Sequence, residues 1–378
     1  MAFTISGVSG ITGLNLTTTQ PPPPPPVYLW SWGQPNSGRL GLGDTVVRSS
    51  PTQIGSLDTW ASISSTGGGG MAQAIKTDGT FWSWGYNGYG QLGLGNTTDI
   101  SSPVQIGALT NWSMAVGGTH SVAAKTDGTM WTWGKNNYGQ LGLGNTTSVS
   151  SPVQVGALTT WSYVHASSSV FSLAIKTDGT LWSWGRNHLG YLGLGDETAR
   201  SSPVQVGALT NWLTVSSAYY SAYAIKTDGT MWSWGQGATG RLGLGNSTYY
   251  SSPVQIGALT TWLKVSGGRN GASAAIKTDG TLWSWGSNSY GRLGLGDTTN
   301  RSSPTQIGAL TSWSDIAAGN YHMAAVKTDG TLWIWGSNDY GCLGLGDTTR
   351  RSSPVQVGAL TSWLTVSAGY NTIFATSN

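Results

Sequence analysis

The side chains that could carry acid–base or metal chemistry are few in this chain and lie far apart. They are the only glutamate, the only cysteine and the four histidines, namely Glu197, Cys342, His120, His165, His188 and His322. No histidine is paired with a plausible nucleophile, and His120 and His322 occupy the same slot of distant segments, which argues against a shared metal. The sequence therefore predicts no catalytic residue, no metal site, no cofactor and no enzyme activity.

Most aspartates fit turns better than they fit catalysis. One set stands in Lys-Thr-Asp-Gly-Thr and a second follows L-G-L-G, where asparagine replaces it freely, so acid–base work is not expected of either. L-G-L-G also lacks the helix and the lysine of a phosphate loop. The lysines beside the Asp-Gly turns could attract anions, but we interpret them as solvated hairpin ends; they are Lys76, Lys125, Lys176, Lys226, Lys277 and Lys327.

The elements that must position any site are set by a unit of about 50 residues that recurs seven times. All 21 tryptophans fall in register with this unit, three in each copy. A paired W-x-W-G is followed by a third tryptophan of T-x-W type, as at Trp131, Trp133 and Trp161. Because repeats pack on their neighbours, we expect one folded body.

One copy of the unit, residues 113–162, shows no helical period and reads as short strands. Asp127-Gly128 predicts a type I′ turn, with positive φ at both central residues, that joins two antiparallel strands. After this turn the tryptophans of W-x-W point to one face of the strand and Met130 to the other. A third strand is expected at residues 153–155, opened by a proline, and a fourth around T-x-W, ending at Val116.

Four short antiparallel strands per unit, bulky on both faces, are typical of a propeller blade, and seven units fit a closed ring. The predicted fold class is therefore all-β, a seven-bladed β-propeller of four-stranded antiparallel blades. The last copy stops where its Asp-Gly turn should begin, while residues 27–33 supply the strand that would follow that turn. We expect the N- and C-terminal strands to pair in one shared blade, which removes free sheet edges.

The first 26 residues differ in kind from the ring. Residues 1–20 carry no charge, and residues 21–26 are six prolines, which form a stiff spacer of roughly 19 Å. We divide the chain into an anchor segment (1–20), a spacer (21–26) and the propeller (27–378). A plain linker is one interpretation of the tail, and the other is an anchor that docks on another protein as an added strand, with apolar residues Phe3, Ile5, Val8 and Ile11.

Antiparallel strands alternate the side on which their connections emerge, so the ring has two distinct faces. What we call the constant face carries the Asp-Gly turns and the G-A-L-T connections, which barely vary. What we call the variable face carries the loop between the first and second strands and the long loop that ends at Ser-Ser-Pro. Arg and Tyr dominate its differing positions, as they do interface hot spots. The predicted partner-binding residues are Arg48, Ile100, Arg200, Tyr219, Tyr220, Tyr249, Tyr250, Arg269, Arg301, Tyr321, His322, Arg350, Arg351 and Tyr370.

Neutral drift at exposed positions is the alternative explanation of these differences. Because the tail enters at the missing Asp-Gly turn, it should leave from the constant face and aim the variable face away from whatever it holds.

Composition narrows the range of possible partners further. The net charge of +3 is too weak and scattered for a nucleic-acid footprint, and no apolar run is long enough to span a membrane. The start of the chain lacks the basic region of a standard signal peptide, and the single cysteine leaves the redox compartment open.

The string W-S-W-G-x-N-x-Y-G-Q-L-G-L-G-D, preceded by A-x-K-T-D-G-T, resembles the repeat of the regulator of chromosome condensation family over residues 27–378. The resemblance implies a seven-bladed propeller that closes through its terminal strands and binds proteins through one face. The family includes guanine-nucleotide exchange factors and bacterial propellers that inhibit beta-lactamases. The near-identical copies look more like the simple propellers of bacterial and phage genomes, and the histidine of the family's G-x-x-H-S loop survives only at His120 and His322.

The sequence supports three candidate functions. The first is a non-enzymatic head that binds protein or glycan, a surface or virion appendage tethered by its tail. The second is a free inhibitor or adaptor for one protein, and the third is an exchange factor for a small GTPase. Fold alone does not choose among them. The sequence leaves the localisation open, with a virion or a cell surface as candidates.

Overall fold

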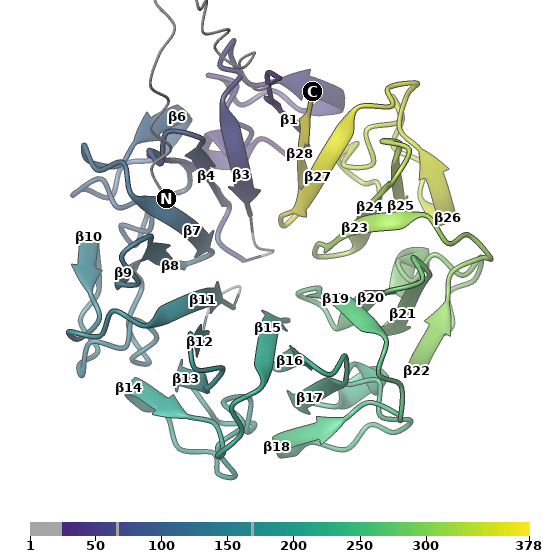
Figure 1. Cartoon of the computed structure of the whole chain (residues 1–378). Helices are drawn as coiled ribbons and strands as arrows, with labels where there is room; N and C mark the ends of the chain where they lie inside the picture. Colours follow the sequence, from purple (N-terminus) through teal and green to yellow (C-terminus); the bar gives the residue numbers. More distant parts are fainter. Residues whose placement is uncertain (1–24, 66–67, 168–169) are drawn as a thin grey trace, which may run out of the picture.

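The structure is a computed structural model that describes residues 25–65, 68–167 and 170–378. The proposed anchor residues Phe3, Ile5, Val8 and Ile11, and the first four prolines of the spacer, lie outside the described residues. Seven four-stranded sheets surround a central opening (Figure 1). The predicted fold class is confirmed.

Each blade runs from an inner strand beside the opening to an outer strand at the rim (Figure 1). The inner strands are β3 (Trp60–Ser64), β7 (Trp112–Gly117), β11 (Trp161–Ala166), β15 (Trp212–Ser217), β19 (Trp262–Gly267), β23 (Trp313–Ala318) and β27 (Trp363–Ala368). The second strands are β4 (Met71–Lys76), β8 (His120–Lys125), β12 (Phe171–Lys176), β16 (Ser221–Lys226), β20 (Ala272–Lys277), β24 (His322–Lys327) and β28 (Thr372–Ser377).

The remaining two strands of each blade carry the paired tryptophans and the rim. The third strands are β5 (Phe81–Gly85), β9 (Met130–Gly134), β13 (Leu181–Gly185), β17 (Met231–Gly235), β21 (Leu282–Gly286), β25 (Leu332–Gly336) and β1 (Tyr28–Gly33). The outer strands are β6 (Ile100–Gln105), β10 (Val149–Gln154), β14 (Arg200–Gln205), β18 (Tyr250–Gln255), β22 (Arg301–Gln306), β26 (Arg351–Gln356) and β2 (Arg48–Gln53). Short 3-10 turns are η1 (Asn36–Gly38), η2 (Ala238–Gly240) and η3 (Ser289–Gly291).

The outer strand begins earlier than predicted. β10 starts at Val149, and Pro152 lies inside the strand, not at its opening. Pairing with β9 shifts register between Val149 and Val153, so the proline falls where the ladder is interrupted and no backbone donor is missed. The expected strand at 153–155 is therefore wrong in its start.

The Asp-Gly hairpin is a different turn from the one predicted. Gly79 has φ +75°, but Asp78 is not among the described residues with positive φ, which excludes type I′. Gly79 N donates to Lys76 O and Lys76 N donates to Thr80 O, the pattern of a type I turn followed by a left-handed glycine. Asp78 Oδ1 accepts from both Thr80 N (2.9 Å) and Thr80 Oγ1 (2.7 Å). The recurring K-T-D-G-T is thus a self-contained hydrogen-bonded turn.

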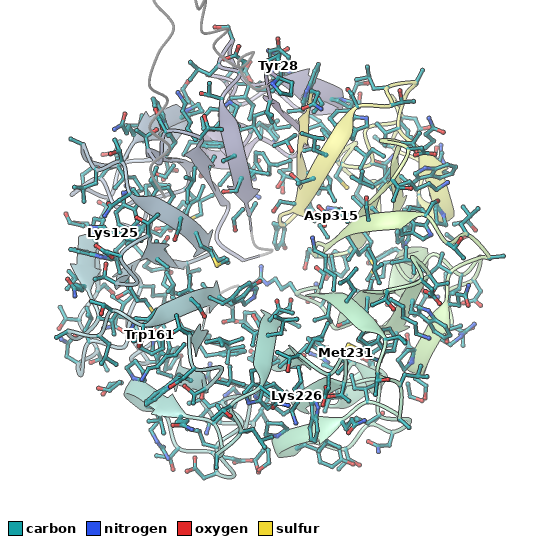
Figure 2. The ribbon with its side chains drawn as sticks, in the orientation of Figure 1. Tyr28, Lys125, Trp161, Lys226, Met231 and Asp315 are labelled. Carbon is teal, nitrogen blue, oxygen red and sulfur yellow. The ribbon has the colours of Figure 1, made fainter. Side chains whose placement is uncertain are left out.

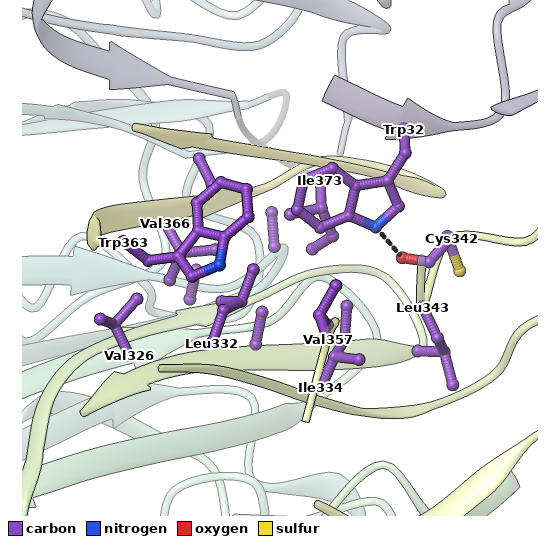
Figure 3. Packing of buried hydrophobic residues seen from close by; sticks show 14 residues of the cluster. Trp32, Val326, Leu332, Ile334, Cys342, Leu343, Val357, Trp363, Val366 and Ile373 are labelled. Atoms are coloured by element: carbon purple, nitrogen blue, oxygen red, sulfur yellow. Dashed lines mark hydrogen bonds between the residues drawn. The ribbon is translucent and has the colours of Figure 1, made fainter. Parts of the chain in front are cut away.

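Adjacent blades are joined by the second tryptophan of each W-x-W pair. Trp335, fully buried, donates its indole N–H to Arg292 O of the preceding blade at 2.9 Å. All seven blades repeat this bond, and Trp32 donates to Cys342 O at 3.0 Å (Figure 3). A Cβ at Gly344 would lie 2.7 Å from the Trp32 indole nitrogen, so the first glycine of the L-G-L-G loop clears the space that the indole fills.

The predicted closure is confirmed by strand pairing. β1 pairs antiparallel with β28, from Tyr28 opposite Ser377 to Gly33 opposite Thr372. The closing sheet therefore runs β2-β1-β28-β27 and combines both ends of the described chain. Its core contains Trp32, Trp363 and Ile373 packed on the preceding blade (Figure 3).

The lysines beside the Asp-Gly turns are packed and not solvated, which corrects the sequence interpretation. Lys226 Nζ lies 3.9 Å from the ring centroid of Trp232 and 4.9 Å from that of Trp212, and only 6% of Lys226 is exposed. The same Trp–Lys–Trp arrangement crosses three strands in six blades. Figure 2 labels Lys226 and Lys125 among them. Burial lowers the pKa of Lys226, while the aromatic faces stabilise its charge.

Candidate functional site on the variable face

Strand order places the loops on two faces as expected. Thr77 N beside the Asp-Gly turn donates to Thr59 O, which lies in the connection leading to the inner strand β3, so both segments share the constant face. The loops from inner to second strand and from third to outer strand must then emerge on the opposite, variable face. Every residue of the predicted partner site belongs to these loops or to the strand ends beside them.

Four of the predicted arginines are held at the start of an outer strand and do not lie at loop tips. Arg200 Nη2 forms an ion pair with Asp196 Oδ2 at 2.6 Å, and its Nη1 donates to Thr198 O at 2.7 Å. The same pair recurs at Asp44–Arg48, Asp297–Arg301 and Asp347–Arg351. These arginine side chains therefore stabilise the conformation of the loop through their ion pairs and hydrogen bonds.

The residue after L-G-L-G does not vary freely, contrary to the sequence interpretation. Blades with aspartate there have arginine four residues later, and blades with asparagine have Ile100, Val149 or Tyr250. Asn246 Nδ2 donates to Tyr250 Oη at 3.2 Å, so the asparagine blade keeps a contact of its own. Ile100 and Tyr250 are half-buried at the same register as the arginines. Paired variation of this kind reflects local fit.

His322 is a wrong member of the predicted surface, because only 1% of it is exposed. It opens β24 beneath the loop, where a Cβ at Gly319 would lie 2.7 Å from its ring. His120 is equally buried and its Nε2 lies 2.8 Å from Ser172 Oγ. Burial lowers the pKa of His120 to about 3 and that of His322 to about 4, so both imidazoles are neutral packing groups.

The predicted residues that do reach the surface lie in a belt of tyrosines and cations. Tyr249 (50% exposed) and Arg350 are exposed, and the others are half-buried. The guanidinium of Arg269 lies 5.1 Å from the ring centroid of Tyr219 and 5.2 Å from that of Tyr370. Because these tyrosines belong to the β15–β16 and β27–β28 loops, Arg269 joins loops of three blades around the mouth of the opening.

Tyr220 and Tyr321 belong to the same belt and are half-buried. Tyr220 stacks on Tyr191 with centroids 6.0 Å apart and meets the edge of His188 at 5.7 Å. Tyr321 lies under Arg292, whose guanidinium is 5.1 Å from its ring. Burial raises the pKa of Tyr191 and of Tyr220, so their hydroxyls stay protonated.

Sequence analysis missed four further tyrosines of the variable face. They belong to the recurring Y-G before L-G-L-G and are between 37% and 42% exposed, namely Tyr89, Tyr138, Tyr290 and Tyr340. Cations lie over three of them, with Lys135 4.7 Å from Tyr89, Arg186 4.6 Å from Tyr138 and Arg350 4.3 Å from Tyr290. Their constancy between copies concealed them, and each cation comes from the loop of the next blade, about one repeat further along the chain, so no local sequence signal pairs the two.

The opening itself holds a cavity of about 200 Å³ lined by inner strands. Lys264, which lines this cavity, donates from Nζ to Asp315 Oδ1 on the next inner strand, and Figure 2 labels Asp315 beside the opening. Asp315 Oδ2 accepts from Val366 N at 2.9 Å, so this carboxylate ties three neighbouring inner strands together. The charges of Lys264 and Asp315 thus compensate each other beside the cavity.

No cluster of three or more His, Cys, Asp or Glu side chains suited to a metal ion exists among the described residues. Within that same part of the chain, no helix has the length and apolar character needed to cross a bilayer.

Seven four-stranded blades, a closing blade shared by both chain ends, and one face of differing loops define a repeat β-propeller. The family model of the regulator of chromosome condensation (RCC1) repeat matches residues 28–72, 78–124, 127–174, 178–225, 228–275, 279–326 and 329–376. The chain therefore belongs to the RCC1 repeat family, which confirms the resemblance seen in its sequence.

Relatives in the family are of several kinds. The chain is 31% identical over 291 residues to the ultraviolet-B receptor UVR8 of Arabidopsis thaliana, which covers 73% of this chain and 65% of that receptor. It is 42% identical over 79 residues to human protein RCC2, covering 21% of this chain and 15% of RCC2. The chain thus spans less than two thirds of the length of either relative.

Solved structures share the fold at lower identity. Human WBSCR16 superposes with a TM-score of 0.81 at 22% identity, over 93% of this chain and all (100%) of that one. Yeast RCC1 (Prp20), in a structure bound to Kap60, gives 0.81 at 18% identity over 93% of this chain and 89% of that chain. At these identities the likeness is one of fold alone.

Proposed function

We propose that this chain is a non-enzymatic binding head that takes a protein or glycan partner on its variable face. The observation that carries the proposal is the belt of tyrosines and cations, half-exposed and different from blade to blade, on one face only. Rigid aromatic rings and guanidinium groups bury contact area at low entropic cost, and tyrosine rings also stack on sugars. The constant face offers no comparable variety.

Relatives support protein binding in general terms. Yeast RCC1 (Prp20) has been crystallised with Kap60, and a second Prp20p structure is described together with its binding to Gsp1p and histones. These partners belong to those proteins. For this chain, an exchange factor for a small GTPase remains the third candidate, and nucleotide-release assays that show no acceleration would remove it.

The tail supports the finer proposal of a tethered appendage on a cell surface or virion. Val27 bridges to Thr59, and Val27 N donates to Asp58 O at 2.6 Å, so the described chain enters from the constant face. Anything held by the preceding residues would lie opposite the variable face. Deleting residues 1–24 should leave the melting temperature unchanged but abolish incorporation into the native assembly. A tight soluble complex that is indifferent to this deletion would instead support a free inhibitor or adaptor.

The binding surface is tested by paired alanine variants. The full chain is screened on glycan and protein arrays, and any ligand found is titrated in solution. The double variant Y249A/R350A should weaken binding at least about tenfold, as expected for exposed aromatic and arginine contacts. The control is L259A on the constant face, because Leu259 is 47% exposed, close to the 50% of Tyr249. Equal effects of both variants would overturn the assignment of the face.

A further inference from the structure

A cavity of about 280 Å³ opens on the variable face between the closing blade and the blade that follows it. It lies between the η1 segment and the glycine-rich end of the β3–β4 loop. Its polar lining comes from Ser37, Arg39, Tyr86, Arg269 and Tyr370. No carboxylate of the described residues lines it, so the guanidinium groups of Arg39 and Arg269 set its charge.

Arg39 stands at a register position that recurs in every blade. Arg241 and Arg292 occupy the same place after glycine and before L-G-L-G, and all three accept an indole N–H of the next blade at their backbone oxygen. Each also donates its Nε to a nearby carbonyl, which for Arg39 is Asn36 O at 2.9 Å. All three arginines therefore accept the indole N–H in the same way, and they differ only in the surroundings of the guanidinium.

Each of the three nitrogens of the Arg292 guanidinium donates a hydrogen bond. Its Nη1 donates to Asn320 O at 3.1 Å, its Nη2 donates to Ser287 Oγ, and Tyr321 of the next blade covers it. This arginine needs no ligand.

Arg39 has no such partners in the described chain. Its Nη1 is buried without a hydrogen bond, and none of the ion pairs among described residues includes it. Where Arg292 meets Tyr321, Arg39 meets Gly70, and a Cβ there would lie 3.0 Å from its Nη2. The glycine keeps open the space that an aromatic ring fills in the other blade.

An uncompensated cation in a partly buried cavity is costly, and an anion relieves that cost. Burial lowers the pKa of Arg39, though the group stays charged at neutral pH. Arg269 lies over the ring of Tyr370 at the same cavity and adds a second positive charge. A planar guanidinium fork matches carboxylate and phosphate oxygens.

We propose that this cavity is a binding site for one oxyanion group, carboxylate or phosphate, with Arg39 as its main donor. The proposal goes beyond the binding head, because the site exists in the free propeller whichever partner the face takes.

The test uses the full chain and calorimetric titration at constant ionic strength. The probes are sodium glucuronate, inorganic phosphate and, as the neutral control, glucose. We expect saturable binding of one glucuronate or one phosphate per chain and none of glucose. Preference for glucuronate points to an acidic sugar or peptide carboxylate, preference for phosphate to a phosphorylated ligand, and equal binding to a general oxyanion site.

The variant R39Q should weaken this binding at least about tenfold, the loss expected for a charge-assisted hydrogen bond. Glutamine occupies the same register at Gln91 and Gln140, so the variant is compatible with the blade. The matched control R241Q removes an equivalent charge outside the cavity and should change binding less than twofold. Should R39Q misfold, the Arg39 Nε–H resonance of the unmodified protein must shift on titration while that of Arg241 does not. Absent saturation, or equal losses in R39Q and R241Q, would refute the site.

Discussion

Cations lie over aromatic rings on both faces of this propeller, but in different surroundings. On the constant face, Lys226 and its five counterparts are packed between two tryptophans, at 3.7 to 4.4 Å from the nearer ring. On the variable face, Lys135 and several arginines lie 4.3 to 5.2 Å from tyrosines that are partly open to solvent. The first set is the same in six blades, while the second changes. A cation over an aromatic ring is thus the same in every copy where the blade buries it, and it differs between copies where it is exposed to solvent.

The largest effect should come from breaking the joint between blades. Trp335→Ala removes a fully buried indole and its bond to Arg292 O, and should cost about 3–5 kcal/mol of unfolding free energy. Denaturant unfolding measures the loss. Leu310→Ala, at a constant-face residue that is 48% exposed, is the control and should change little. Similar losses in both would mean that the indole joint is not where stability resides.

Acidification should come next, through the histidines beneath the variable face. In the folded state the pKa is about 3 for His120 and about 4 for His322, both below the usual value of 6.5. The unfolded chain therefore binds more protons below pH 6.5, and stability must fall as pH decreases from 6.5 toward 4. Each histidine contributes a slope of up to about 1.4 kcal/mol per pH unit. Urea unfolding between pH 6.5 and 4.5 measures the free energy of unfolding at each pH, and His120→Asn should remove the contribution of one histidine from its pH dependence. A free energy of unfolding that does not change with pH in the native chain would contradict the burial of these histidines.

The comparison of the two faces is sharpened by removing one lysine from each. Lys226→Met should cost about 1–2 kcal/mol, because its ammonium is largely desolvated between two indoles. Lys135→Met removes a lysine over the partly exposed Tyr89 and should cost about 0.5–1 kcal/mol at most. Thermal and denaturant midpoints of the two variants provide the measurement. The reverse order would show that burial does not separate the two sets.

The smallest effect concerns the Asp–Arg pairs of the long loops. D196N and R200Y singly should each cost about 0.2–1 kcal/mol, since the pair is only partly buried. The double variant reproduces the Asn–Tyr combination of Asn246 and Tyr250 and should recover most of that loss. A double-mutant cycle measures the coupling. Strictly additive losses would show that the two positions vary independently.

Backbone architecture was predictable because its signals are local. The W-x-W pairs and the Asp-Gly hairpins are each recognised within a few residues, and their repetition indicates the number of blades. The complementary half-units at residues 27–33 and 368–378 indicate the closure. The turn type was wrong because Asp78 accepts two hydrogen bonds from Thr80 in a turn that needs only one positive φ. Local composition did not reveal that choice.

The candidate site was predicted less completely, because side-chain environments depend on the neighbouring strands. Burial of Lys226 needs tryptophans from two other strands, and burial of His322 needs the loop above it. Arg200 looked like a free loop residue until its ion pair with Asp196 was in view. Differences between copies therefore mark both exposed positions and compensated pairs, and only packing separates them.

The shared closing blade also imposes an order on biosynthesis. β1 and β2 precede the other strands of the described chain, yet β1 pairs with β28, which in turn pairs with β27. A nascent chain can assemble the intervening blades one after another, but β1 and β2 must wait until β28 has been synthesised. Any prematurely terminated product carries an unmatched pair of strands with bare hydrogen-bonding edges, a mark by which quality control can recognise it.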